Sequence, residues 1–148
     1  MDLELLGNSI FYIAKNIQEV IELCLRNYPL NYSQIQILLM IKQLSAKTCV
    51  NQETLALHLH LDKSNISRNL SYLKQNGYVV TQPAKRDSRR REITLTPKGN
   101  FELQYIIKVM RDISVEMTQN ISPEKGDITI TTLTDIMKNL EHMKDELI

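Results

Sequence analysis

The chain has 148 residues, 43% of them hydrophobic, which is enough for one domain with its own hydrophobic core. No stretch approaches the roughly 20 apolar residues of a membrane-spanning helix, and the acidic start at Asp2 and Glu4 lacks the basic residues of a signal peptide, so we expect a cytoplasmic protein without membrane contact. A net charge of +1 and two cysteines exclude a uniformly basic protein and a disulfide framework.

Two helices are predicted before residue 50. Apolar residues recur at steps of three and four through residues 3–28, and Pro29 ends this amphipathic helix because the residue before a proline avoids the α region. Residues 34–44 form the second helix, with Ser33 as its N-cap; it is apolar on most faces and therefore expected to be buried. Val50, at the end of the following linker, is expected to add a short strand to a sheet downstream.

Residues 51–77 have the pattern of a helix-turn-helix. Asn51 caps a short helix, and His60, one of the few non-glycine residues enriched at positive φ, stands in the turn after it. Asp62 caps a second helix, and Gly77 suits the left-handed position just past its end. In such motifs the first helix braces the second over the major groove of DNA, so we interpret the second as a recognition helix.

The recognition helix has one apolar and one polar face. Ile66, Leu70 and Leu73 fall together at about 100° per residue and are expected to face the core. The opposite face carries small polar side chains and almost no acid, so that a phosphate backbone can approach it closely. The candidate DNA-contacting residues of this helix are Lys63, Ser64, Asn65, Ser67, Arg68, Ser71 and Lys74.

A basic hairpin is predicted downstream. Residues 78–82 and 91–96 have the composition of two strands, and the turn-rich loop of residues 83–90 joins them as the wing of a winged helix-turn-helix. Residues 61–100 contain 9 of the 18 basic residues but 3 of the 17 acidic ones, and such a basic patch on a neutral chain is typical of DNA binding. The candidate DNA-contacting residues of the wing are Lys85, Arg86, Asp87, Arg89, Arg90 and Arg91.

Two further helices are predicted after the wing. Thr96 caps one that begins with Pro97 and extends to about Asn120, and Ser122 followed by Pro123 begins the last one. Both helices carry apolar residues along one side, and in the last helix these residues repeat at close to 3.5 positions. Long apolar seams at both ends of a chain are most simply buried against a second copy.

The expected fold is therefore mainly α, of the α+β kind, with a winged helix-turn-helix and long terminal helices. Residues 1–148 form one domain. Within it, residues 1–30 and 100–148 form the dimerisation region, and residues 31–99 form the DNA-binding part.

Four short motifs occur in a known order: LHLDKSNISR at residues 59–68, LKQNGYV at 73–79, Asp87-Ser88-Arg89 in the wing, and LTPKG at 95–99. The Asp-x-Arg of the wing, followed by Leu-Thr-x-x-Gly, is the most specific part. In these motifs, and in the order of elements over nearly the whole chain, the sequence resembles the MarR family of bacterial transcription regulators.

That resemblance implies a homodimer that binds double-stranded DNA, with the recognition helix in the major groove and a wing arginine in the adjacent minor groove. Arg89 then takes the position at the wing tip, and Asp87 orients a neighbouring arginine. It further implies that the protein is a repressor that binds a pseudo-palindromic operator, and that a small-molecule effector relieves this repression. MarR-like proteins often bind small aromatic acids between the dimerisation helices and the DNA-binding part, and the residues expected to line such a crevice here are Tyr12, Tyr32, Met40 and Tyr105.

Two alternatives stay open, and a third is set aside. A redox-sensing regulator would use Cys24 or Cys49, of which Cys49 has Lys47 close by, a neighbour that favours the thiolate. A winged helix whose basic face binds a protein or RNA partner is another interpretation. A catalytic role has no support, because the four glycines form no phosphate-binding loop and no nucleophile motif is present, so we expect neither an enzyme nor a cofactor. His58 and His60 lack the neighbouring ligands of a metal site.

Overall fold

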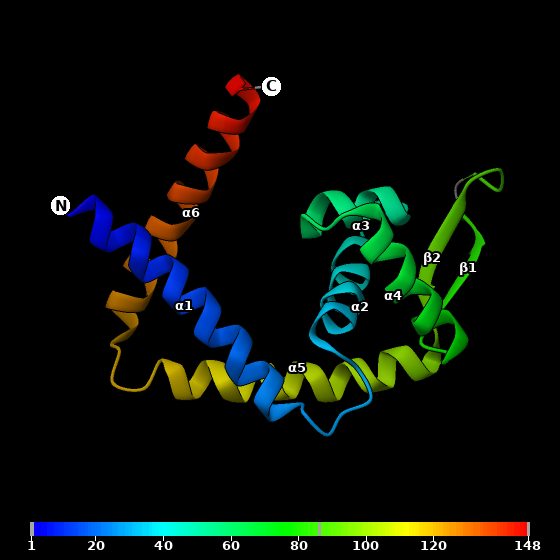
Figure 1. The fold of residues 1–148 in the computed structure, drawn as a ribbon, viewed down its shortest axis with the longest axis horizontal. Helices are drawn as coiled ribbons and strands as arrows, with labels where there is room; N and C mark the ends of the chain where they lie inside the picture. Colours follow the sequence, from blue (N-terminus) through cyan, green and yellow to red (C-terminus); the bar gives the residue numbers. More distant parts are fainter. Residues whose placement is uncertain (1, 86, 148) are drawn as a thin grey trace. The chain divides into compact units, whose positions relative to one another are not determined.

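The computed structural model describes residues 2–85 and 87–147, so the predicted wing residue Arg86 lies outside the described residues. The chain divides into two compact units, residues 1–113 and 114–148. The described residues contain six helices and one antiparallel hairpin, which confirms the mainly α fold with a small sheet (Figure 1). The elements in chain order are α1 (Leu3–Cys24), α2 (Tyr32–Leu44), α3 (Gln52–Leu59), α4 (Lys63–Gln75), β1 (Val79–Pro83), β2 (Arg91–Leu95), α5 (Pro97–Met117) and α6 (Pro123–Leu147).

The core of the first unit is built around α2, which is buried as predicted. Ile37, Leu38 and Ile41 of this helix are completely inaccessible to solvent. They belong to one cluster with buried residues of α1, α3, α4, β2 and α5. Because α2 contacts α3, α4 and β2, it is the common support of the helix-turn-helix and of the hairpin (Figure 1).

The N-terminus of α2 differs from the prediction. Asn31, not Ser33, is the N-cap: its Oδ1 accepts the backbone N–H of Gln34 at 2.9 Å, and Oε1 of Gln34 accepts the backbone N–H of Asn31 at 3.0 Å. This reciprocal capping box satisfies two backbone donors at once. The helix therefore begins one half-turn earlier than expected.

The end of α1 also differs from the prediction. The helix ends at Cys24 instead of Tyr28, and the backbone N–H of Tyr28 donates to the carbonyl of Leu25 at 2.8 Å in a tight turn. Leu25 and Leu30 on either side of this turn are both 4% exposed. Bringing both side chains into the core requires the chain to change direction before Pro29, so burial ends the helix earlier than the proline alone would.

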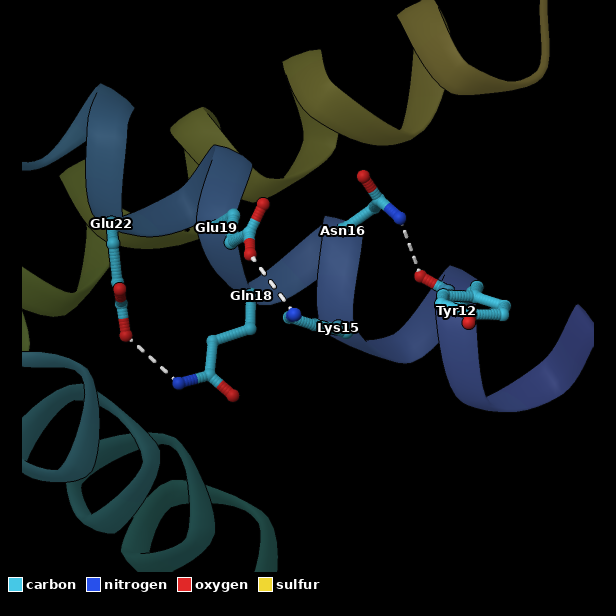
Figure 2. A network of polar contacts seen from close by, with 6 residues as sticks. All are labelled: Tyr12, Lys15, Asn16, Gln18, Glu19 and Glu22. Atoms are coloured by element: carbon cyan, nitrogen blue, oxygen red, sulfur yellow. Dashed lines mark hydrogen bonds and ion pairs between the residues drawn. The ribbon is translucent and has the colours of Figure 1, made fainter. Parts of the chain in front are cut away.

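The polar contacts that Figure 2 draws on the exposed side of α1 stay within that helix. The ammonium of Lys15 lies 4.0 Å from the carboxylate of Glu19, and Gln18 donates to Glu22 at 2.8 Å. Asn16 donates to the backbone carbonyl of Tyr12 at 2.7 Å. Contacts between residues four apart stabilise a helix but tie it to no other element.

The helix-turn-helix and the hairpin agree closely with the prediction. Asn51 and Asp62 cap α3 and α4, and His60 between these helices has a φ of 52°. β1 and β2 pair from Val79 opposite Leu95 to Pro83 opposite Arg91. The expected strand at Val50 is wrong: among the described residues this sheet has two strands, and Val50 contributes a single carbonyl, which accepts the N–H of Ile93 at 2.8 Å.

The last two helices begin where the sequence predicts. The Thr96 hydroxyl accepts the N–H of Gly99 at 3.0 Å and so caps α5. α5 ends at Met117, three residues before the predicted end, and Asn120 adopts a φ of 65° in the turn that follows. Every described residue of α6 is at least partly exposed. None of the helices in the described ranges is long and apolar enough to cross a membrane.

Candidate nucleic-acid interface

The recognition helix α4 is held from beneath by its apolar face. Ile66, Leu70 and Leu73 are at most 1% exposed, as predicted. At the far end of the helix the Tyr72 hydroxyl donates to the carbonyl of Pro29 at 2.9 Å, which ties α4 to the turn between α1 and α2. Buried side chains along the inner face and a hydrogen bond at the C-terminal end leave the polar face of α4 directed outward.

A carboxylate organises the N-terminus of this helix. Oδ1 of Asp62 accepts the hydroxyl of Ser64 at 2.6 Å and the backbone N–H of Asn65 at 2.7 Å. The bond from Ser64, then the bond from the Asn65 N–H, lower the pKa of the Asp62 carboxyl, and the charge of Arg68 adds a smaller effect in the same direction. The anionic cap therefore persists at neutral pH, where it stabilises the first turn.

Most of the predicted side chains on α4 are available to a ligand. Arg68 and Lys74 are exposed and form no ion pair within the described residues. Lys63 lies 3.7 Å from Glu53, but both side chains are more than three-quarters exposed, so this ion pair is weak and a phosphate can replace it. The hydroxyl of Ser71 is used within the helix, where it donates to the carbonyl of Ser67 at 2.9 Å.

The contact of Asn69 with Asn65 on α4 was not predicted from the sequence. Nδ2 of Asn69 donates to the backbone carbonyl of Asn65 at 3.0 Å and to Oδ1 of the same residue at 2.8 Å. The sequence signal that could have revealed this contact is the spacing of two asparagines one helical turn apart.

The wing presents its arginines around a turn. Asp87, Arg89, Arg90 and Arg91 are all exposed. The carbonyl of Arg90 accepts the N–H of Ala84 at 2.8 Å, and the guanidinium of Arg91 donates to the carbonyl of Thr81 at 3.1 Å. Arg91 is thus bound to the hairpin itself, whereas Arg89 and Arg90 project from it. Lys85 is exposed as well, at the edge of a cavity of about 230 Å³.

The base of the wing depends on contacts that the sequence did not reveal. Lys98 donates to the carbonyl of Asn76 at 2.7 Å, and its ammonium lies 4.4 Å from the centre of the Tyr78 ring. The Thr96 hydroxyl donates to the carbonyl of Gly77 at 2.5 Å. Gly99 touches the backbone of Tyr78 so closely that a Cβ at this position would lie 2.1 Å from its carbonyl oxygen. These contacts join the end of α4, the start of β1 and the start of α5.

The four candidate effector residues do not gather in one place. Tyr32 and Met40 line a common cavity of about 190 Å³. Tyr105 stacks on Tyr28 with 5.4 Å between ring centres, and Tyr12, which is 60% exposed, packs against its neighbour in sequence. A larger cavity of about 490 Å³, also bordered by Tyr32, lies along the turn between α1 and α2. Neither cavity is lined by Tyr12 or Tyr105.

Tyr28 connects this region to α5. Its hydroxyl donates to the carboxylate of Glu102. Burial, and after it the bond to Glu102, raise the pKa of the Tyr28 hydroxyl well above its usual value. The group therefore stays protonated at neutral pH and acts as a hydrogen-bond donor only toward Glu102.

The cysteines and histidines have local partners. Cys24 is an exposed free thiol, and the thiol of Cys49 lies 3.8 Å from the carbonyl of Arg91. Nδ1 of His58 lies 2.8 Å from the carbonyl of Thr54. Within residues 2–85 and 87–147 no three metal-ligating side chains come together.

Comparison with known proteins agrees with this arrangement. A model of the MarR family matches residues 28–90. The HTH-type transcriptional repressor YetL of Bacillus subtilis is 28% identical over 138 residues, which cover 93% of this chain and 81% of YetL. Among solved structures, the transcriptional regulator PA3341 has a TM-score of 0.84 at 20% identity and covers 93% of this chain and 98% of its own. The repressor CouR, solved bound to a 23-mer DNA duplex, has a TM-score of 0.73 at 24% identity, with coverage of 90% and 93%. The part of the chain that carries the helix-turn-helix and most of the wing thus matches the MarR family, and the chain shares the fold of solved transcription regulators.

Proposed function

We propose that this chain binds double-stranded DNA as a homodimer and represses transcription at a pseudo-palindromic operator. The observation that carries the proposal is the outward polar face of α4, fixed from beneath by a buried apolar face and flanked by the exposed arginines of the wing. CouR, which shares this fold, is a repressor that was solved on a DNA duplex, and YetL is a repressor by name; both support the assignment.

In this arrangement the two parts of the surface have different tasks. Ser64, Asn65, Ser67 and Arg68 on α4 are short or extended donors and acceptors that reach base edges in the major groove, where each base pair presents a distinct pattern. Lys63, Ser71 and Lys74 flank them and anchor the phosphate backbone. The wing adds Arg89 to the neighbouring minor groove, while Lys85, Arg90 and Arg91 increase the attraction for phosphates.

Dimerisation follows from the apolar surface that the single chain leaves exposed. On α6, Leu133, Met137, Leu140 and Met143 repeat along one side, and all four are at least 40% exposed. α1 likewise exposes large apolar side chains, among them Leu3, Leu5, Phe11 and Ile13. Seams of this kind gain free energy when a second copy buries them, and a dimer matches the two half-sites of a palindromic operator.

Regulation by a small aromatic effector fits the cavities beside α2. The cavity shared by Tyr32 and Met40 is small, and the larger cavity, lined by Arg26, Tyr28 and Tyr72, combines aromatic rings with a cation. Since Tyr72 belongs to α4, a ligand in the larger cavity would contact the recognition helix directly. Oxidation of Cys49 is the competing signal, because its thiol approaches the carbonyl of Arg91, where β2 begins next to the wing loop. We place the protein in the cytoplasm, where it meets DNA.

Selection of bound duplexes from a random pool tests the proposal. We expect a palindromic consensus, and an affinity for it that falls steeply as salt is raised, because phosphate contacts release counterions. Arg68→Ala and Lys74→Gln should each reduce the affinity, whereas Lys125→Gln, which removes one exposed charge from α6, should not. Enrichment of no duplex, or binding to RNA or a protein with little salt dependence, would support the interaction-module alternative instead.

A further inference from the structure

The side chain of Asn65 is held in one orientation by Asn69. These residues lie one turn apart on α4, both partly buried, and the amide nitrogen of Asn69 makes two hydrogen bonds to Asn65. One goes to the backbone carbonyl at 3.0 Å and the other to the side-chain Oδ1 at 2.8 Å.

The backbone carbonyl decides which way both amides face. A carbonyl oxygen only accepts, so the atom of Asn69 that faces it must be the donor Nδ2. An amide nitrogen only donates, so the atom of Asn65 that faces Nδ2 must in turn be the acceptor Oδ1. The Nδ2 of Asn65 is therefore on the other side of its amide, directed away from Asn69, and it donates to no group in the described part of the chain.

We propose that Asn69 is a positioning residue that restricts Asn65 to reading bases as a hydrogen-bond donor. The inference rests on the proposed function, in which α4 enters the major groove. A free asparagine recognises adenine by accepting from N6 and donating to N7 at the same time. With Oδ1 turned toward Asn69 and Nδ2 directed away from it, Asn65 offers an NH₂ group whose natural partners are the adjacent acceptors O6 and N7 of guanine. The amino group of adenine is also a donor and cannot accept a hydrogen bond from that NH₂ group. We therefore expect guanine to be preferred over adenine at the base pair that Asn65 contacts.

Two substitutions of Asn69 separate positioning from simple support of the helix. In Asn69→Ala the Oδ1 of Asn65 is free, so the guanine-to-adenine ratio, expected at roughly 5- to 150-fold for one good base contact, should fall to a few-fold. In Asn69→Asp the carboxylate only accepts and takes Nδ2 of Asn65, which turns Oδ1 outward. The preference should then change from guanine to the bases that present an amino group, adenine and cytosine.

The measurement is the ranking of the four bases at each operator position, obtained from duplex selection and confirmed by titration at fixed salt. Ranking is used because the added negative charge of Asn69→Asp weakens binding to every duplex alike. Asn65→Ala identifies the position that depends on Asn65. Asn65→Ala combined with Asn69→Asp is the matched control, which should rank the bases as Asn65→Ala does. Alanine favours helix, so Asn69→Ala keeps the test available if the aspartate variant fails to fold.

The expected result is guanine in the wild type, reduced discrimination in Asn69→Ala, and a reversed ranking in Asn69→Asp. A ranking at the Asn65-dependent position that is the same in all three proteins would overturn this inference while leaving the proposed function intact. A wild type that ranks adenine above guanine at that position would also overturn it. A wild-type protein with no base preference at any operator position would overturn both this inference and the proposed function.

Discussion

The carboxylate of Asp87 accepts a hydrogen bond from the backbone N–H of Arg89 at 3.0 Å. The carbonyl of Asp87 also accepts the N–H of Arg90 at 3.0 Å, so both polar groups of this residue stabilise the turn at the wing tip. The sequence led us to expect an ion pair between Asp87 and a neighbouring arginine side chain. Among the described residues, which do not include Arg86, Asp87 forms no such pair; its carboxylate binds the backbone of Arg89, whose guanidinium forms no ion pair there.

Because of this geometry, two substitutions of Asp87 should change the affinity for DNA in opposite directions. Asp87→Asn keeps an Oδ1 acceptor for the Arg89 N–H and removes a negative charge, so it should tighten binding to any duplex. Asp87→Ala removes the same charge and the acceptor together, and should weaken binding to the specific site because the turn is no longer held. Titration of both variants at fixed salt measures the difference. If the alanine variant binds as tightly as the asparagine variant, the bond to Arg89 has no role in DNA binding.

The base composition beside the operator tests the role of Arg89. A narrow A·T-rich minor groove has enhanced negative potential, so Arg89→Ala should lose more affinity on A·T-flanked operators than on G·C-flanked ones. Arg90→Ala removes the same charge one residue away and is the matched control. If both variants lose the same affinity on both operators, Arg89 contributes only a positive charge, as the other basic residues of the wing do.

Arg68 tests the division between base reading and anchoring on α4. If it makes a bidentate base contact, Arg68→Ala should cost roughly 1–3 kcal/mol of binding free energy and relax the preference at one position per half-site. Lys63→Ala and Lys74→Ala should weaken all sequences alike and reduce the slope of affinity against salt. Selection on randomised operators with each variant provides the comparison. A uniform loss in Arg68→Ala would identify Arg68 as a phosphate anchor.

The dimer interface is tested by a charge in the seam of α6. Leu140→Glu should raise the dimer dissociation constant and weaken operator binding together, because burying an unpaired carboxylate is costly. A charge at Leu6 of α1 should act in the same direction. Thr131→Glu places the same charge on the opposite face of α6, at about 100° per residue, and should leave the dimer intact. Analytical ultracentrifugation distinguishes the variants, and a monomeric wild type at micromolar concentration would contradict the dimer.

Acid should weaken the cap of the recognition helix. The pKa of Asp62 is lowered from the usual 3.8 in the folded protein, mainly by the hydrogen bond from Ser64. A group with a lowered folded pKa contributes stability that is present above its unfolded pKa and lost as the pH falls through its folded pKa. Between pH 6 and about pH 2, the wild type should therefore lose stability that Asp62→Asn, whose amide oxygen caps without titrating, does not lose. Denaturant unfolding of both proteins across this range measures the effect, and parallel curves would show that Asp62 does not contribute.

A methyl group at Gly99 should destabilise the junction between the wing and α5. Its Cβ would overlap the carbonyl oxygen of Tyr78, and relieving such a clash typically costs roughly 1–3 kcal/mol of the free energy of unfolding, occasionally more. Gly7→Ala is the matched control, because nothing lies within 4 Å of the added Cβ and alanine favours the helix by roughly 0.5–1 kcal/mol. Thermal unfolding should show opposite shifts, and a Gly99→Ala variant as stable as the wild type would contradict the close approach.

The accuracy of the sequence predictions depended on how far apart the interacting residues are in the chain. The caps at Asn51, Asp62 and Thr96, and the positive φ values of His60 and Gly77, were predicted correctly because each depends on residues within a few positions. The apolar faces of α2 and α4 were predicted for the same reason, since helical periodicity is a local property.

The errors and omissions arose where a local signal competed with packing. Ser33 and Asn31 are both acceptable caps, each with a glutamine three residues later, and the structure uses Asn31 with Gln34. A helix through Tyr28 is locally reasonable, but burial of Leu25 and Leu30 ends α1 four residues earlier.

The tertiary structure alone decided which distant residues meet. The bond from Tyr28 to Glu102 joins positions 74 residues apart, and the contact of Gly99 with Tyr78 depends on the pairing of β1 with β2. The orientation of Asn65 depends on the rotamer of Asn69, which periodicity does not determine. The sequence therefore determined most of the elements and the division of α4 into an apolar and a polar face, because these follow from local backbone preferences and a repeating apolar pattern. The side-chain orientations and long-range contacts followed only from folding, because they depend on which side chains the packed core leaves room for.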